Sequence, residues 1–198
     1  MKWPWFSFLV APSLVALILL ASPAHAEDRP RTVPTRDVDV VYLMAGPTAP
    51  LAQRMRWGVT LGKLRVDPPS PGLFVIIDTA THEVQAVREG DRSVVQLDPA
   101  AAGPMLAPPG SYTRRGAARV AGLDCTQWET RDVAGRAVLA CLTEDGVLLR
   151  VQADNLVIIE AAEVHFGPLG PQVFRIPADY RKIISQNVSR QRPQTVYP

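Results

Sequence analysis

Apolar and polar residues alternate along many short segments of this chain, and turn residues separate these segments. In the segment 52–57 (AQRMRW), Met55 and Trp57 fall on one side and Arg54 and Arg56 on the other. A period of two over a few residues is typical of a β-strand with one buried face. Alternating or continuously apolar segments predict further strands at residues 37–45, 61–66, 72–78, 83–88, 92–97, 111–115, 117–123, 123–130, 136–143, 147–153, 156–166 and 173–176.

Turn residues recur at a regular interval between the predicted strands. Gly46-Pro47, Gly90-Asp91 and Asp145-Gly146 are examples, and a spacing of about eight to twelve residues is typical of antiparallel sheets. Helical signals are scarce, and only 98–106 and 178–185 are predicted to form short helices. The pattern therefore predicts a mainly β, antiparallel fold with one or two short helices.

Residues 1–26 have the three parts of a secretory signal peptide. A positively charged start is followed by an apolar stretch, and Ala24-His25-Ala26 supplies small residues at the cleavage site. An uncleaved membrane anchor is the alternative, but Pro12 interrupts the apolar stretch, which is shorter than the ~20 residues that span a bilayer. The sequence predicts cleavage after Ala26 and export of the remaining chain.

The exported part has the size and charge of one ordinary domain. We expect a flexible linker at 27–36, a single β-rich domain at 37–184 and a flexible tail at 185–198, because both ends are polar and contain proline. The whole chain has 21 basic and 19 acidic side chains, without a basic patch. This balance gives no electrostatic reason to expect a nucleic-acid partner.

The two cysteines, Cys125 and Cys141, lie in two strands of a predicted hairpin. If Thr130 lies opposite Arg136, Cys125 lies directly opposite Cys141, where a disulfide can form. In the chain-entropy model such a bond stabilises the fold by ~3 kcal/mol. The spacing is too wide for a Cys-x-x-Cys redox pair, and too few histidines remain to complete a zinc site. An oxidising compartment favours the disulfide over both alternatives.

The order of these motifs resembles the half-barrel fold of periplasmic lipoprotein carriers and related exported proteins of uncharacterised function. The resemblance covers roughly residues 53–97 and 116–180, and begins with a basic-aromatic strand, an R-x-D strand and an I-x-D strand. These three are Gln53–Trp57, Leu64–Asp67 and Phe74–Asp78, followed by Val84–Val87. The later matching residues are Gly122, Cys125, Cys141, Thr143, Asp145, Gly146, Phe174, Ile176, Pro177 and Tyr180.

The resemblance implies a strongly curved antiparallel sheet, an incomplete barrel whose concave face is partly covered by helix. Carriers of this shape hold acyl chains against that face, although this chain has few helices to form a lid. Inward-facing candidates for an apolar ligand face, which could equally form an ordinary filled core, are Met55, Trp57, Leu64, Val66, Phe74 and Ile76.

No catalytic motif is evident in the sequence. It contains no Gly-x-Ser-x-Gly elbow and no His-Glu-x-x-His helix. His82 lies in a predicted turn, and His165 shares a strand face with Glu163, which favours a surface ion pair over a general base. The sequence therefore predicts a protein that is not an enzyme and that has no metal or cofactor.

Two functions remain open. The first is a periplasmic binding module that holds a lipid or an acylated partner on the concave face. The second is a structural or protein-interaction domain of the cell envelope, with a filled core and a protein partner.

Overall fold

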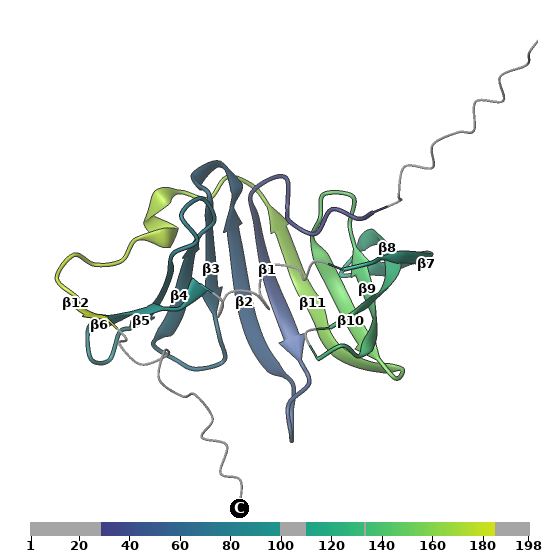
Figure 1. The fold of residues 1–198 in the computed structure, drawn as a ribbon, viewed down its shortest axis with the longest axis horizontal. Coiled ribbons are helices and arrows are strands. Elements are labelled where there is room, and N and C mark those ends of the chain that lie inside the picture. The colour runs from purple at the N-terminus through teal and green to yellow at the C-terminus, as the bar shows by residue number, and fades with distance from the viewer. Residues whose placement is uncertain (1–28, 100–109, 133, 185–198) are drawn as a thin grey trace, which may run out of the picture.

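The computed structural model describes residues 29–99, 110–132 and 134–184. They form one sheet of twelve strands in the order β12-β6-β5-β4-β3-β2-β1-β11-β10-β9-β8-β7. Figure 1 shows the sheet as a single bent layer that does not close on itself. The predicted mainly β fold with a strongly curved, open sheet is confirmed. The predicted signal peptide and the predicted tail at 185–198 lie outside the described residues.

All neighbouring strands run antiparallel except β12 and β6, which are parallel. The strands are β1 (Val38–Met44), β2 (Leu51–Gly58), β3 (Lys63–Asp67), β4 (Leu73–Asp78), β5 (Val84–Arg88), β6 (Ser93–Leu97), β7 (Thr113–Val120), β8 (Leu123–Arg131), β9 (Ala137–Leu142), β10 (Leu148–Ala153), β11 (Leu156–Phe166) and β12 (Arg181–Ile184). Two 3-10 turns, η1 (Val59–Leu61) and η3 (Pro171–Phe174), lie wholly within the described residues.

The strands on the β2 side of β1 pair without interruption. The ladders that join β1 to β2, β2 to β3, β3 to β4, β4 to β5 and β5 to β6 each keep one register along their length. An unbroken register keeps every second side chain on the same face, so one continuous apolar face can form across these strands.

The strands on the β11 side of β1 contain four irregularities. Register shifts occur between β1 and β11, between β11 and β10, between β10 and β9, and between β8 and β7. A β-bulge adds an extra residue to one strand, which bends that strand and increases its local twist. These four shifts account for the strong curvature of this half of the sheet.

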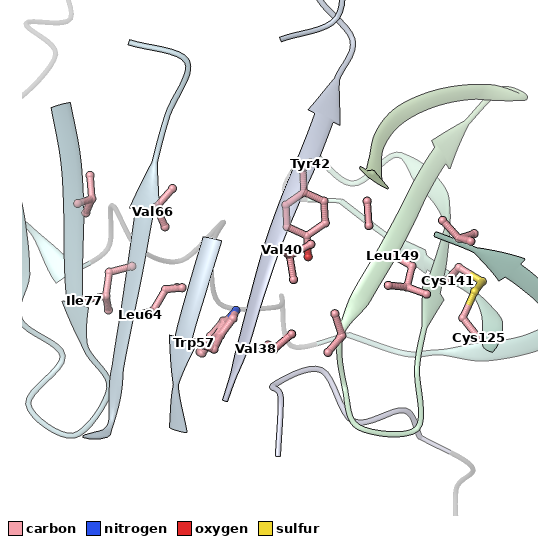
Figure 2. Packing of buried hydrophobic residues seen from close by; sticks show 14 of the residues in the cluster. Val38, Val40, Tyr42, Trp57, Leu64, Val66, Ile77, Cys125, Cys141 and Leu149 are labelled. Carbon is pink, nitrogen blue, oxygen red and sulfur yellow. A yellow bond between two sulfur atoms is a disulfide. The ribbon is translucent and has the colours of Figure 1, made fainter. Parts of the chain in front are cut away.

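The larger hydrophobic core lies on the face toward which the sheet bends, hereafter the concave face. Val38, Leu64, Ile77 and Leu149 have no exposed surface, and Val84 is 1% exposed. Figure 2 shows such side chains on neighbouring strands, together with the bond between the two cysteines. The apolar residues that alternate in the sequence therefore lie on one buried side of β1 to β5, as is typical of half-buried strands.

The segment after β11 packs across the opposite, convex face. Phe174 of η3 is 5% exposed and belongs to a second cluster with Phe74, Ile76, Val87 and Val94. A strand is predicted at 173–176, and that prediction is wrong because Phe174 enters this cluster from a 3-10 turn that begins at Pro171. Gly58 makes room for the ring, since a Cβ at this position would lie 2.7 Å from Phe174.

The last described residues of the chain form a strand at the edge of the sheet. The helix predicted at 178–185 is wrong, because residues 181–184 form β12 and pair with Ser93 to Gln96 of β6. The N–H of Arg181 donates to the carbonyl of Arg92 at 2.9 Å, and the Arg92 side chain forms an ion pair with Asp179. The free edge of β6 offers hydrogen-bonding groups that outweigh a weak helical preference.

Smaller differences concern element boundaries. Residues 111–115 and 117–123, predicted as two strands, contribute to one strand, β7, with a bulge in place of the predicted break. The predicted strand at 61–66 begins only at Lys63, after η1 and the left-handed Gly62. The helix predicted at 98–106 lies almost wholly outside the described residues.

Candidate functional site

A cavity of about 320 Å³ lies on the concave face of the sheet, between β2 and β8. Most of its wall is apolar. The lining residues are Thr32, Pro34, Tyr42, Gln53, Met55, Trp57, Tyr112, Thr130, Arg131, Asp132, Val138, Ala140, Leu142, Gly146, Val147, Leu148, Val151 and Ile159.

The cavity exists because the sheet bends around it. Met55 and Trp57 are on β2, whereas Thr130 is on β8, and four strands separate β2 from β8 in the sheet. Side chains from strands so far apart can line one cavity only if the sheet curves toward it, because neighbouring strands are about 4.8 Å apart. The small side chain of Ala140, at the middle of β9, leaves space at the base of the curve.

The N-terminal segment before β1 forms part of the wall. Pro34 is buried and lines the cavity with Thr32. The segment is held by Asp145, whose carboxylate accepts hydrogen bonds from Thr35 Oγ1 at 3.2 Å and from Arg36 Nη2 at 2.7 Å. Part of the predicted linker at 27–36 is thus attached to the sheet.

Gly146 allows this segment to approach closely. Its φ is +85°, and a Cβ at this position would lie only 2.3 Å from the carbonyl oxygen of Val33. The turn between β9 and β10 that contains Gly146 is also closed by Thr143, whose Oγ1 accepts the N–H of Val147 at 3.0 Å. The Thr143, Asp145 and Gly146 of the resemblance motif therefore build a turn and hold the cavity wall.

Tyr42 lines the cavity and crosses from β1 to β10. Its hydroxyl donates to the carbonyl of Leu148 at 2.8 Å, at the start of the bulge between β10 and β9. Burial raises the pKa of the Tyr42 hydroxyl, which keeps the group protonated as a donor. This hydrogen bond satisfies a backbone acceptor next to an interruption in the ladder.

Two hydroxyl-bearing residues of the lining, Thr130 and Tyr112, lie beside each other. Thr130 is 8% exposed. Tyr112 lines the same part of the cavity, and its ring packs edge-on against Trp128 at 6.5 Å between centroids. Burial raises the pKa of Tyr112, and a side-chain hydrogen bond with Thr130 offsets part of that effect.

The two charged lining residues are at the turn between β8 and β9. Asp132 Oδ1 accepts the backbone N–H groups of Arg136 and Ala134, both at 2.9 Å. These hydrogen bonds, with that of the Arg136 side chain, lower the pKa of Asp132 and keep it anionic. Arg131 Nη1 donates to the carbonyl of Gly135 at 2.7 Å. Each of these charged groups therefore has a partner in the turn.

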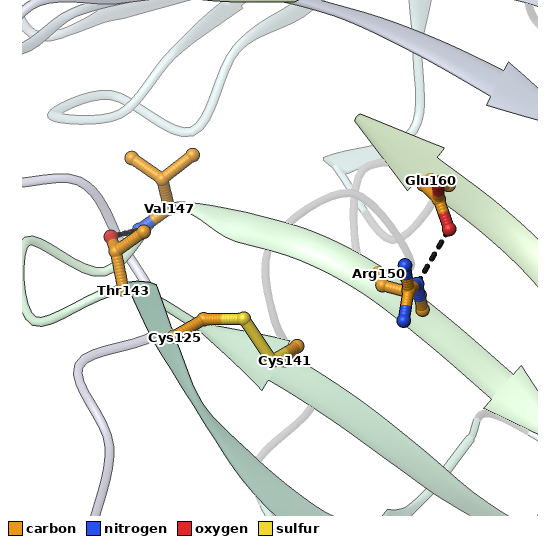
Figure 3. The surroundings of a disulfide bond; sticks show 6 residues. All are labelled: Cys125, Cys141, Thr143, Val147, Arg150 and Glu160. Atoms are coloured by element: carbon orange, nitrogen blue, oxygen red, sulfur yellow. Dashed lines mark hydrogen bonds and ion pairs between the residues drawn. A yellow bond between two sulfur atoms is a disulfide. The ribbon is translucent and has the colours of Figure 1, made fainter. Parts of the chain in front are cut away.

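The two cysteines form a disulfide beside the cavity, as predicted. The bond joins Cys125 of β8 to Cys141 of β9, with 5.5 Å between the Cα atoms, and Cys141 is flanked by the lining residues Ala140 and Leu142. Figure 3 shows the bond next to the turn of Thr143 and Val147 and near the ion pair of Arg150 with Glu160.

The predicted register of this hairpin is wrong. Thr130 lies opposite Val138 rather than Arg136, and Cys141 lies opposite Gln127, so the cysteines bridge diagonally rather than directly. The reason lies in the turn, where Asp132 caps two backbone N–H groups and Gly135 adopts a φ of +78°. The turn is therefore centred one residue later than the glycine count alone indicates.

The six predicted apolar candidates are divided between two faces. Met55 and Trp57 line the cavity. Leu64 and Val66 lie opposite Trp57 and Met55 on the same face, but they are buried in the core beside the cavity.

The prediction of an inward-facing side chain is wrong for Phe74 and Ile76. Val66 lies opposite Val75, so it is Val75 and Ile77 that share the concave face. Phe74 and Ile76 point to the convex face and pack against Phe174. Strand β4 is apolar on both faces, and period two alone cannot assign an orientation to such a strand.

Sequence reasoning missed most of the lining. Val138, Ala140 and Leu142 alternate along β9, and this pattern could have indicated a wall. Thr32, Pro34 and Thr130 gave no comparable signal, because a linker and a lone threonine become lining residues only when the sheet bends around them.

The histidine and carboxylate side chains considered as catalytic candidates lie away from the cavity. His165 and Glu163 are both largely exposed, and 3.6 Å separates His165 Nε2 from Glu163 Oε2. Within residues 29–99, 110–132 and 134–184, no group of three or more His, Cys, Asp or Glu side chains could hold a metal ion. Over the same residues, no helix has the length and hydropathy needed to cross a membrane.

Comparisons with known proteins support the fold. No protein-family model and no curated protein matches this chain. Among solved structures, an uncharacterised conserved protein from Thermus thermophilus is similar over 75% of this chain and 90% of its own, with a TM-score of 0.55 and 16% identity. MucB is similar over 76% of this chain and 61% of its own, with a TM-score of 0.50 and 12% identity.

A structure of Pseudomonas aeruginosa MucA/MucB also aligns, over 76% of this chain and 59% of its own, with a TM-score of 0.42 and 12% identity. At these identities, the likeness to the Thermus protein and to MucB is one of fold. The half-barrel that the sequence resemblance implies is thus the fold observed.

Proposed function

We propose that this protein is an exported, non-enzymatic binding module that holds an acyl chain, of a lipid or of an acylated protein, in the cavity on its concave face. The observation that carries this proposal is the largely apolar cavity of about 320 Å³ between β2 and β8. Ligand sites in proteins are typically concave and mostly apolar, with few polar groups and volumes from about 300 Å³ upward.

The size of the cavity suits a hydrocarbon chain. An engineered apolar cavity of ~150 Å³ binds one benzene molecule, so a cavity twice as large corresponds to roughly a dozen carbon atoms. Met55, Trp57 and Tyr42 provide flexible and aromatic contact surface on one wall, and Val151 and Ile159 provide branched side chains on another. Each methylene removed from water contributes ~0.8 kcal/mol to binding.

The apolar wall extends beyond the cavity, toward the end of the sheet. Met44 lies opposite both Leu51 and Ile159, so these three side chains share the face of Met55 and Trp57. Leu51 is 41% exposed at the end of this row. A chain longer than the cavity could follow this row out to the sheet edge, which favours an acyl chain over a compact apolar ligand.

Two features support export. Residues 1–26 have the pattern of a cleavable signal peptide, and a disulfide persists in an oxidising compartment. The resemblance to lipoprotein carriers favours the bacterial periplasm as that compartment.

The second candidate function is a protein-interaction domain of the cell envelope. It is favoured by exposed apolar side chains near the strand ends, where Leu156 is 72% exposed and Val157 41%. Leu43 of β1 is 43% exposed in the same end of the sheet. In this alternative, a protein partner covers these side chains and the cavity has no acyl ligand.

The first experiment measures binding of Nile red and its displacement by methyl decanoate. We expect saturable binding with one site per chain. Ala140→Leu should weaken it by at least tenfold, because the added side chain occupies the cavity. Ala137→Leu, at an exposed residue at the start of the same strand, is the matched control and should bind normally.

Extraction of protein purified from its native compartment, followed by mass spectrometry, complements this test. Acyl species at about one per chain support the proposal. Failure of both Nile red and methyl decanoate to bind, in protein that retains its disulfide and folds normally, would favour the protein-interaction domain instead.

A further inference from the structure

We infer that the cavity selects acyl chains that end in a singly charged carboxylate, as a free fatty acid does, and that Arg131 binds this carboxylate at the turn between β8 and β9. The inference rests on the proposed function and concerns the polar end of the same ligand. It is based on the charge of the lining and on the partners that the charged side chains of this turn have.

The polar lining residues of β8 and its turn lie together at one end of the strand. Thr130, Arg131 and Asp132 are consecutive, and Tyr112 shares a side-chain hydrogen bond with Thr130. The lining residues of the neighbouring strand β9 are all apolar. A ligand that lays its apolar tail against β9 therefore finds polar partners for its other end at this turn.

Arg131 supplies the positive charge. Among the lining residues that the structure describes, it is the only basic one. Its Nη1 donates to the carbonyl of Gly135 at 2.7 Å, and no carboxylate of the described residues forms an ion pair with it. A guanidinium has five N–H donors, and a carboxylate can accept two of them side by side. The bond to one neutral carbonyl therefore leaves donors of Arg131 for an anion.

Asp132 does not neutralise Arg131, because it is paired with Arg136. The distance between Arg136 Nη2 and Asp132 Oδ2 is 2.7 Å, and Asp132 Oδ1 accepts the backbone N–H groups of Arg136 and Ala134. These hydrogen bonds, first that of the Arg136 backbone, lower the pKa of Asp132 and keep it anionic. Two arginines and one aspartate leave the turn with one surplus positive charge, which a singly charged carboxylate balances. A doubly charged group would be repelled by Asp132.

The exposure of Arg131 lowers the cost of binding an anion at this turn. A carboxylate buried deep in an apolar cavity would lose its hydration, which is costly. At an exposed turn, the carboxylate keeps part of its hydration and gains a charge-assisted hydrogen bond. A free fatty acid is ionised near neutral pH and has such a group, whereas an ester or an amide has no charge. Because exposed ion pairs contribute modestly, we expect a preference of a few fold.

The test compares the dissociation constants of decanoate and methyl decanoate, measured by displacement of Nile red from the full exported chain near neutral pH. We expect wild type to bind decanoate at least as tightly as the ester. Arg131→Gln should weaken decanoate binding by about threefold or more and change ester binding by less than about 1.5-fold. Arg131→Lys keeps the charge and should retain decanoate binding within about twofold.

Arg119→Gln is the matched control. It removes the same charge from β7, at an exposed residue that pairs with Asp124 and does not line the cavity. Both ligands should bind this variant as they bind wild type. Added salt should weaken the binding of decanoate by wild type toward that of Arg131→Gln, because salt screens an exposed ion pair, and should leave ester binding unchanged.

The possible results separate the two proposals. Weaker binding of decanoate than of the ester by wild type, an unchanged affinity ratio in Arg131→Gln, or an equal loss in Arg119→Gln would each overturn the inference and leave the acyl-binding function intact. If neither Nile red nor either decanoate compound binds the folded wild-type protein, the proposed function fails, and the inference fails with it.

Discussion

The two halves of the sheet on either side of β1 have the same kind of sequence but different interiors. From β1 to β6 every ladder is regular, and the concave face of β3 to β5 is filled, with Leu64, Ile77 and Val84 at most 1% exposed. From β11 to β7 four register shifts interrupt the ladders, and the concave face of these strands encloses the cavity together with side chains of β1 and β2. We call these the regular half and the bulged half.

This difference between the two halves shows why one contains a filled core and the other a cavity. A regular ladder stacks apolar side chains in rows that pack against one another, and close packing leaves no space. Bulges bend the strands, so that walls from β2 and β8 face each other across a gap that small residues such as Ala140 do not fill.

The two halves are also anchored differently. The regular half carries the C-terminal segment on its convex face, through the cluster around Phe174, and ion pairs such as those of Asp67 with Arg56 and Arg65. The bulged half carries the disulfide and the N-terminal segment held by Asp145. The comparison therefore predicts that stability and ligand binding can be changed separately.

The largest effect is expected from Phe174→Ala in the regular half. Removing this buried ring should lower the free energy of unfolding by about 3–5 kcal/mol, measured by denaturant titration. Binding of Nile red should not change in the folded fraction, because Phe174 lies on the convex face. Leu156→Ala, at a residue that is 72% exposed, is the control and should change stability little. Loss of binding in folded Phe174→Ala protein would show that the halves are coupled.

The next effect concerns the disulfide in the bulged half. The double variant Cys125→Ala and Cys141→Ala should lower the free energy of unfolding by ~3 kcal/mol, because a loop of this size is no longer closed in the unfolded chain. The dissociation constant for methyl decanoate should stay within about twofold, since the effect acts mainly on the unfolded state. A tenfold loss of affinity would instead mean that the bond shapes the wall formed by Ala140 and Leu142.

The smallest effect is a pH dependence in the regular half. Burial opposes ionisation of Asp67, but hydrogen bonds from Arg65 and Arg56 outweigh it and lower its pKa, while Lys63 lowers the pKa of Asp78. A carboxyl whose pKa is lowered by folding contributes stability that is present above its unfolded pKa, about 4, and is lost as the pH falls below it. Stability should therefore decrease below about pH 4.

Asp67→Asn tests the origin of this loss. The variant should be less stable than wild type at pH 7, and the difference should shrink as the pH falls below about 4, followed by thermal unfolding across that range. Asp124→Asn, at an exposed carboxyl paired with Arg119 on the bulged half, should show almost no such change. A difference for Asp67→Asn that stays constant with pH would contradict the ion-pair explanation.

Much of the regular half could be predicted from the sequence. Met55 and Trp57 alternate with two arginines, and the structure keeps that order across β2 and β3. The alternation failed at β4, where Phe74 and Ile76 face outward, because an apolar strand covered on both faces carries no orientation signal. The orientation of β4 was decided by one segment, residues 169–180, which packs against the convex face.

The bulged half could be predicted less well. The disulfide followed from the cysteine count and from the hairpin, but its register depended on how Asp132 caps the turn. The bulges gave no clear signal, since one extra residue in a strand looks like ordinary variation in an alternating pattern. Without the bulges, the approach of Thr32 and Pro34 to Thr130 could not be foreseen.

The sequence by itself determined the strand content, the antiparallel hairpins and the pairing of the two cysteines, because side-chain periodicity, turn residues and compartment are local or countable properties. The tertiary structure alone decided which faces turn inward, where the sheet bends and that a cavity lies between β2 and β8. Those features depend on contacts between residues far apart in the chain, such as Asp145 with Arg36 and Tyr42 with Leu148. No local pattern encodes a distance between strands that meet only after folding.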